Sequence, residues 1–73
     1  MEVPGTRCHL RPSLHAADRM IGQGIRADAV LEAILKGAKR REGARVVASH
    51  RGKEVVFIKR PCRYFLVTAY WLT

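Results

Sequence analysis

The sequence predicts an α+β fold in which two N-terminal helices pack on one face of a small antiparallel sheet of three to four strands. Two observations lead to this fold class. Apolar residues recur at helical spacing between residues 14 and 35. Beyond residue 44, β-branched and aromatic residues dominate, as they do in strands. Two amphipathic helices need an apolar surface to cover, and one face of the sheet supplies it.

The length and composition fit a single soluble domain. The chain has 73 residues, so we expect one domain spanning residues 1–73. Hydrophobic residues make up 48% of it, which suffices for a core and argues against disorder. No apolar run reaches the roughly 18 residues of a membrane-spanning helix, and no signal peptide is recognisable. We therefore expect a cytoplasmic protein without a membrane partner.

The first part of the chain predicts a short strand followed by a helix. Residues 7–10 are expected to form the strand, which Pro12 ends. Ser13 suits a helix N-cap because its hydroxyl can accept hydrogen bonds from amides of the first turn. A glycine at the helix end can adopt the left-handed conformation that closes it, which favours an end at residues 22–24. Four residues share one apolar stripe that we expect to be buried: Leu14, Ala17, Met20 and Ile21.

Residues 27–36 predict the second helix more strongly. Asp28 lies in its first turn and Lys36 in its last, where the helix dipole favours these charges, and Gly37 follows. Residues 39–43 are basic and poor in apolar side chains, so we expect a connection there. One face carries the apolar residues Ala27, Val30, Leu31, Ile34 and Leu35.

Three strands are expected in the remainder, over residues 45–49, 54–59 and 63–72. Residues 51–53 offer a tight hairpin turn, and Pro61 favours the next turn. Strict alternation in the last strand places Thr68 and Tyr70 on one face and Trp71 on the opposite face, in the core. The register of the first hairpin stays open, because a slip of one residue exchanges its faces.

All of the net charge of +8 arises between residues 36 and 63, where ten basic residues face only Glu42 and Glu54. A field of one sign over half a small domain attracts a polyanion, so RNA is the expected partner. The alternative is a solvated basic surface without a ligand. The residues expected to bind nucleic acid are Lys39, Arg40, Arg41, Arg45, His50, Arg51, Lys53 and Lys59.

No metal ion or cofactor is expected. The six acidic residues are scattered through the chain, and no phosphate-binding glycine loop is present. Cys8 and Cys62 are far apart in sequence and are expected to be free or buried thiols in a reducing cytosol. A disulfide between them is the alternative, and metal-ligand spacing is lacking.

The remaining chemistry is RNA cleavage without a metal ion. The 2′-hydroxyl of RNA can attack its own phosphate if a protein supplies a proton acceptor, a proton donor and cations. His15 and Arg19 are four residues apart and would share one helix face. Together with the hydroxyls of Thr68 and Tyr70, they are the candidate catalytic residues. The alternatives are a solvent-facing His15 paired with Asp18, and ordinary strand roles for the other two.

Short motifs resemble a known family. The string HAADRM that begins at His15, the pair Gly24–Ile25, and the string LVTAY that ends at Tyr70 are similar to a small bacterial and archaeal domain family of uncharacterised function. That family is grouped with the RelE/ParE-like toxins and the wider barnase–EndoU–colicin–RelE set of ribonucleases. The family commonly has an arginine before the Gly-Ile pair, whereas this chain has Gln23.

The resemblance implies a RelE-like domain with His15 and Thr68 as active-site candidates and Arg19 and Tyr70 beside them. It also implies an acidic antitoxin laid over the basic surface. The leading expectation is thus a RelE-like RNA-interacting protein, a metal-independent endoribonuclease toxin of a toxin–antitoxin pair. A non-catalytic nucleic-acid-binding module is the first alternative. A small homodimer that pairs through an exposed sheet edge is the second.

Overall fold

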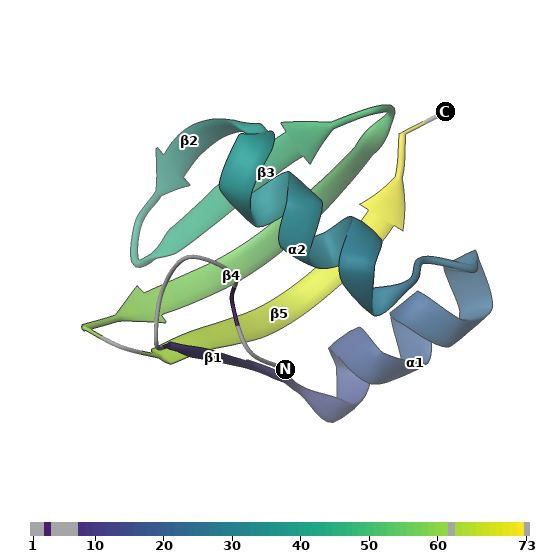
Figure 1. The fold of residues 1–73 in the computed structure, drawn as a ribbon, viewed down its shortest axis with the longest axis horizontal. Helices are drawn as coiled ribbons and strands as arrows, with labels where there is room; N and C mark the ends of the chain where they lie inside the picture. Colours follow the sequence, from purple (N-terminus) through teal and green to yellow (C-terminus); the bar gives the residue numbers. More distant parts are fainter. Residues whose placement is uncertain (1–2, 4–7, 62, 73) are drawn as a thin grey trace.

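The computed structural model describes residues 3, 8–61 and 63–72. One sheet contains five strands in the order β1-β5-β4-β3-β2, and α2 lies across one of its faces (Figure 1). Neither described helix has the length and apolar character needed to cross a membrane. The elements in chain order are β1 (His9–Pro12), α1 (Leu14–Gln23), α2 (Ala27–Lys36), β2 (Ala38–Glu42), β3 (Arg45–His50), β4 (Lys53–Arg60) and β5 (Arg63–Trp71).

The predicted fold class is wrong in its sheet and in the place of its helices. The sheet has five strands and is mixed, because β1 pairs parallel with β5 while the other three pairings are antiparallel. Both helices lie between β1 and β2 in the chain, so they do not precede the sheet. A parallel pair needs a long crossover connection. Residues 13–37, which hold both helices, belong to the connection that follows β1.

The additional strand is β2, in the region expected to be a basic connection. All five of its residues are exposed, and it pairs with β3 at the edge of the sheet. Gly43 has a φ of +64°, which turns the chain tightly into β3. Charged residues are common on edge strands, because they discourage pairing with other chains. Such a strand lacks the apolar alternation that sequence patterns detect.

Helix α1 begins and ends as expected but buries a different side. The Ser13 hydroxyl accepts a 3.0 Å hydrogen bond from the Ala16 amide, and Gly24 closes the helix in the left-handed conformation. The predicted apolar stripe is wrong for Leu14 and Ile21, which are 89% and 82% exposed. The helix runs along the free edge of β5 beyond β1, where the Ser13 amide donates to the Leu66 carbonyl at 3.0 Å. Only a narrow side centred on Ala16 is buried there.

Helix α2 covers the sheet and forms the core with it. Its bounds match the expectation, with Asp28 in the first turn and Lys36 in the last. Gly37 follows, where a Cβ would lie 2.5 Å from the Ala33 carbonyl oxygen and 2.9 Å from that of Ser49. The α2 contribution to the core is Val30, Ala33 and Ile34, packed with Leu10, Ala48, Val55, Phe57, Tyr64, Leu66 and Ala69.

A β-bulge in β5 breaks the strict alternation that the sequence suggested. Phe57 pairs with Leu66 while the preceding Val56 pairs with Thr68, so Val67 is an extra residue. The alternation of side chains between the two faces therefore shifts by one residue at Val67. Thr68 and Tyr70 do share a face, as expected. Trp71 is 43% exposed, so its expected place in the core is wrong.

The N-terminal cysteine is not the free thiol that we expected. Cys8 is buried beside β1 and is disulfide-bonded in the structure. A disulfide restricts the unfolded chain and so stabilises a small domain. The chain's other cysteine, Cys62, lies outside the described residues.

Candidate functional site

One face of the sheet carries neither of the described helices (Figure 1), and we call it the open face. Residues paired across neighbouring strands share a face, so the register of the sheet identifies its side chains. None of these side chains belongs to the core cluster under α2. The open face carries His9, Arg11, Arg40, Glu42, Arg45, Val47, Ser49, Glu54, Val56, Ile58, Arg60, Arg63, Phe65, Thr68 and Tyr70.

A hydrogen-bonded network occupies one end of the open face. The Tyr70 hydroxyl donates to Glu54 Oε1 at 2.7 Å. The other oxygen of Glu54, Oε2, accepts from Arg40 at 2.8 Å and from Ser49 at 2.9 Å. Arg40 also forms a 2.7 Å ion pair with Glu42. The Glu54 side chain is only 9% exposed, so the network links four strands around a buried carboxylate.

These contacts fix the protonation states of the network. The hydrogen bonds from Tyr70, Arg40 and Ser49 lower the pKa of Glu54 from 4.5 to about 2. The hydrogen bond to Glu54 in turn raises the pKa of Tyr70. At neutral pH, Glu54 is therefore an anion and Tyr70 a phenol that donates to it. Neither group is free to accept a proton from a ligand, and two carboxylates offset the charge of Arg40.

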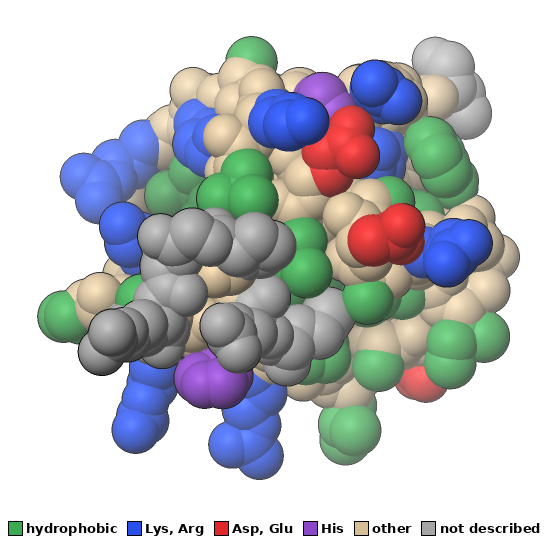
Figure 2. Space-filling model, viewed as in Figure 1, with side chains coloured by type: hydrophobic (Ala, Val, Ile, Leu, Met, Phe, Trp, Pro, Cys, Tyr) green, Lys and Arg blue, Asp and Glu red, His purple; other side chains and the backbone are tan. Residues whose placement is uncertain are grey.

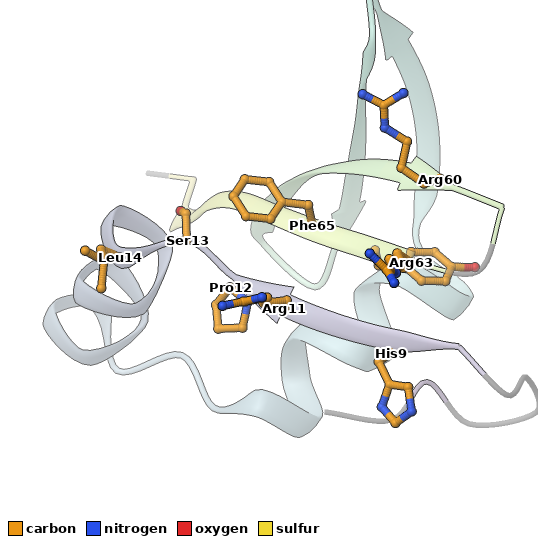
Figure 3. A pocket seen from close by; sticks show the side chains of 9 residues that line it. His9, Arg11, Pro12, Ser13, Leu14, Arg60, Arg63 and Phe65 are labelled. Carbon is orange, nitrogen blue, oxygen red and sulfur yellow. The ribbon is translucent and has the colours of Figure 1, made fainter.

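The other end of the open face is hollowed. We call this feature the β1–β5 hollow; its volume is about 880 Å³ (Figure 3). Arg63 pairs with Arg60 of β4 and with His9 of β1, while Phe65 pairs with Arg11 in the next row. The hollow is lined by His9, Arg11, Pro12, Ser13, Leu14, Arg60, Arg63, Tyr64 and Phe65.

The β1–β5 hollow is strongly positive. Among the described residues, every ion pair that involves an arginine uses Arg26, Arg40 or Arg51. Arg11, Arg60 and Arg63 are therefore charged without a described carboxylate beside them. The planar guanidinium of arginine presents donors that match the oxygens of a phosphate. Beside the three arginines, Phe65 is 42% exposed, which leaves an aromatic surface accessible.

The four candidate catalytic residues come from two elements, α1 and β5. Thr68 and Tyr70 are half-buried on the open face, as expected. His15 and Arg19 lie exposed on α1, which runs along the sheet edge. In the described part of the chain, no hydrogen bond or ion pair joins either of them to Thr68 or Tyr70. Their joint action in catalysis stays a prediction.

The predicted nucleic-acid-binding residues are divided between the two faces. Arg40 and Arg45 lie on the open face. Lys39, Arg41 and Lys59 lie on the opposite side, where they line a second hollow of about 420 Å³ beside α2. Figure 2 shows this helix-covered side, on which Lys and Arg side chains follow the rim while acidic side chains lie nearer the centre, over α2. The basic segment thus contributes cations to both faces of the sheet.

The remaining three predicted residues lie where β3 turns into β4. His50 Nε2 lies 2.9 Å from Glu32 Oε1 of α2, and Arg51 lies 3.5 Å from the same oxygen. The hydrogen bond with His50 lowers the pKa of Glu32. Lys53 is buried, and its ammonium lies 5.6 Å from the ring centre of Trp71. The three side chains therefore already have partners within the protein.

Sequence reasoning missed the β1–β5 hollow. Arg60 and Arg63 were part of the basic segment but were not among the predicted contacts, and Arg11 lies in the neutral N-terminal half. One signal was present: His9 and Arg11 flank the apolar Leu10, a pattern typical of a strand with one buried face. The parallel pairing of β1 with β5 then places these residues beside Arg63 and Phe65.

Comparison with known proteins adds no assignment. No family model, curated protein or solved structure matches this chain. The RelE-like resemblance therefore stays a prediction. Within the described residues, no group of three or more His, Cys, Asp or Glu side chains is placed to hold a metal ion.

Proposed function

We propose that the protein binds single-stranded RNA on the open face, centred on the β1–β5 hollow. The observation that supports it most is the grouping of Arg11, Arg60 and Arg63 around an exposed Phe65, without a described acid among them. Guanidinium groups bind phosphate oxygens in bidentate fashion, and an aromatic ring stacks on a base. The net charge of +8 adds long-range attraction for a polyanion.

A single strand is a better fit than a duplex. Phe65 lies on the surface of a strand, so only a base that is splayed out of its own stack can lie against the ring. In a duplex the bases are stacked on one another and unavailable for such a contact. A non-catalytic RNA-binding module is the simplest protein that these features support.

The finer form of the proposal is a RelE-like endoribonuclease toxin, held inactive by an acidic antitoxin. Its support is the resemblance of the His15 and Thr68–Tyr70 motifs, together with the basic surface. His9 adds an imidazole that lines the same hollow as the three arginines. An imidazole near phosphate-binding cations is suited to proton transfer during RNA cleavage.

Binding is tested with a fluorescently labelled single-stranded RNA, by anisotropy over a series of NaCl concentrations. The variant Arg60→Ala/Arg63→Ala removes two charges from the β1–β5 hollow. The matched control Arg41→Ala/Lys59→Ala removes two charges from the helix-covered side, neither of which is in a described ion pair. We expect the first variant to lower affinity at least tenfold and to reduce the slope of log K against log salt by about 1.4, at about 0.7 per contact. Equal losses in both variants would show that the open face is not the site.

Cleavage is tested separately, with ribosomal, transfer and messenger RNA in the presence of a chelator. The finer proposal predicts products from the wild-type protein and their loss in His15→Ala or His9→Ala. The two histidine variants decide which imidazole is required. A wild-type protein that binds these RNAs but leaves them intact would reject the toxin and keep the binding module.

A further inference from the structure

We propose that the β1–β5 hollow is a nucleotide site that takes a terminal phosphate, a phosphomonoester, together with the adjoining base. The inference rests on the proposed function, because it names the part of an RNA that the open face recognises. The shared chemistry could come from the end of an RNA strand or from a free mononucleotide. The hollow of about 880 Å³ is of the size that small-molecule sites have.

The charge of the hollow favours a monoester over a diester. Arg11, Arg60 and Arg63 come from three different strands, and all three line it. A phosphodiester within a strand carries one negative charge, whereas a terminal phosphate carries about −1.5 to −2 at pH 7. Arg60 and Arg63 lie at one end of the hollow and Arg11 lies nearer Pro12, so the three guanidinium groups together give the whole hollow a charge that suits the more negative ligand (Figure 3). A terminal phosphate also offers three free oxygens to donors, one more than a diester offers.

The arrangement of charged and apolar groups indicates a ligand with two unlike ends. Arg60 and Arg63 lie on either side of the turn that joins β4 to β5. Pro12 and Leu14 lie at the opposite end of the hollow, where β1 leads into α1, and Phe65 lies between the two ends (Figure 3). A nucleotide has this polarity, because its phosphate is charged while its base is uncharged and has a flat face that stacks on an aromatic ring. Inorganic phosphate alone would leave Phe65 without a partner.

Among the described residues, the rest of the open face offers no equivalent site. Arg40 is engaged by Glu42 at 2.7 Å and by Glu54 at 2.8 Å. An incoming phosphate would have to compete there with two carboxylates that already neutralise the guanidinium. Arg45 is exposed and lies directly across from Glu42 in the β2–β3 pair. A phosphomonoester is therefore expected to select the hollow over the remaining surface.

The test compares RNA hexamers of one sequence that end in a 5′-phosphate, a 3′-phosphate or hydroxyls only. Adenosine 5′-monophosphate, adenosine, ribose 5-phosphate and inorganic phosphate serve as small probes, and calorimetry gives the affinities. We expect one terminal phosphate to strengthen hexamer binding roughly tenfold, as charge-assisted hydrogen bonds allow. This gain in affinity from the terminal phosphate should vanish in Arg63→Ala. It should remain in Arg45→Ala, which removes an open-face arginine outside the hollow.

Phe65→Leu separates the base contact from the phosphate contact. It should lower the affinity for adenosine 5′-monophosphate several-fold and leave the affinity for ribose 5-phosphate unchanged, because the aromatic ring stacks on the base alone. Circular dichroism confirms that each variant is folded. Equal effects on both ligands would overturn the base contact and with it the nucleotide assignment.

The outcomes separate the inference from the proposed function. If all three hexamers bind equally well, the inference is wrong and RNA binding stands. If no hexamer binds but adenosine 5′-monophosphate does, the site is a nucleotide site and the RNA-binding proposal is wrong. A phosphorylated hexamer that binds much more tightly than the mononucleotide identifies the strand end as the ligand. Comparable affinities identify the free nucleotide.

Discussion

The hydroxyl of Tyr70 donates a 2.7 Å hydrogen bond to Oε1 of Glu54, its direct neighbour across the β4–β5 pair. The carboxylate in turn reaches Ser49 on β3 and Arg40 on β2. One buried acid thus joins four of the five strands from the face that no helix covers. We therefore assign this network to the stability of the sheet, and the ligand chemistry to the opposite end of the open face.

Replacing Tyr70 with Phe tests the structural role of the network. The variant keeps the ring and removes a hydrogen bond to a charged acceptor, so we expect the free energy of unfolding to fall by about 1–2 kcal/mol. Tyr64→Phe is the matched control, because the Tyr64 ring packs against Phe57 and no described hydrogen bond uses its hydroxyl. Urea unfolding followed by circular dichroism measures both. Equal stability of the two variants would contradict the assignment.

Acid should weaken the protein over a defined interval of pH. The pKa of Glu54 is lowered in the folded state from 4.5 to about 2. The folded state therefore favours the ionised form, and its contribution to stability is complete above pH 4.5 and is lost as pH falls toward 2. Urea midpoints measured from pH 7 to pH 2 should decline, and Glu54→Gln should show a shallower decline. Asp18→Asn, which removes an exposed carboxyl in no described ion pair, is the control.

Two glycine substitutions should change stability in opposite directions. A Cβ at Gly37 would lie 2.5 Å from the carbonyl oxygen of Ala33, so Gly37→Ala should cost about 1–3 kcal/mol. Gly22 lies within α1 and would place its Cβ in open space, so Gly22→Ala should stabilise by about 0.5–1 kcal/mol. Melting temperatures of the two variants provide the comparison. An unchanged melting temperature for Gly37→Ala would mean that the chain at Gly37 packs less closely against β3 than the structure shows.

The disulfide at Cys8 should contribute strongly to the stability of so small a domain. Cys8→Ser is expected to lower the free energy of unfolding by about 2–4 kcal/mol, the usual contribution of a native disulfide. Wild-type protein with and without a reducing agent should show the same difference. Trp71, the single tryptophan, lies near the end of β5 and reports unfolding by its fluorescence. If neither Cys8→Ser nor the reducing agent changes the free energy of unfolding, the prediction is contradicted.

The helices were the part of the fold that the sequence predicted best. Capping by Ser13, closure at Gly24 and the charges of α2 are local features, and each was found as expected. The predicted fold class was wrong because it missed two non-local features. The pairing of β1 with β5 depends on residues more than fifty positions apart, and β2 carries exposed charges in place of an apolar alternation. Neither leaves a periodic pattern in the chain.

The candidate site was less predictable, for related reasons. A single extra residue, Val67, changes the phase of β5 and decides which side chains share a face with Thr68. The division of the basic segment between two faces follows from β-strand geometry, because Arg40 and Arg41 must point in opposite directions. The hollow needed Arg11 and Phe65 to meet, and only the parallel pairing brings them together.

The parallel pairing also constrains how the chain can fold as it is made. In the described sheet, β1 pairs with no other strand than β5, which is the last described strand. Leu10 is only 1% exposed in the folded protein. During synthesis on a ribosome, its side chain therefore stays exposed to water until β5 has left the ribosome. The described core should therefore form late and nearly at once, since the first and the last described strands close it together.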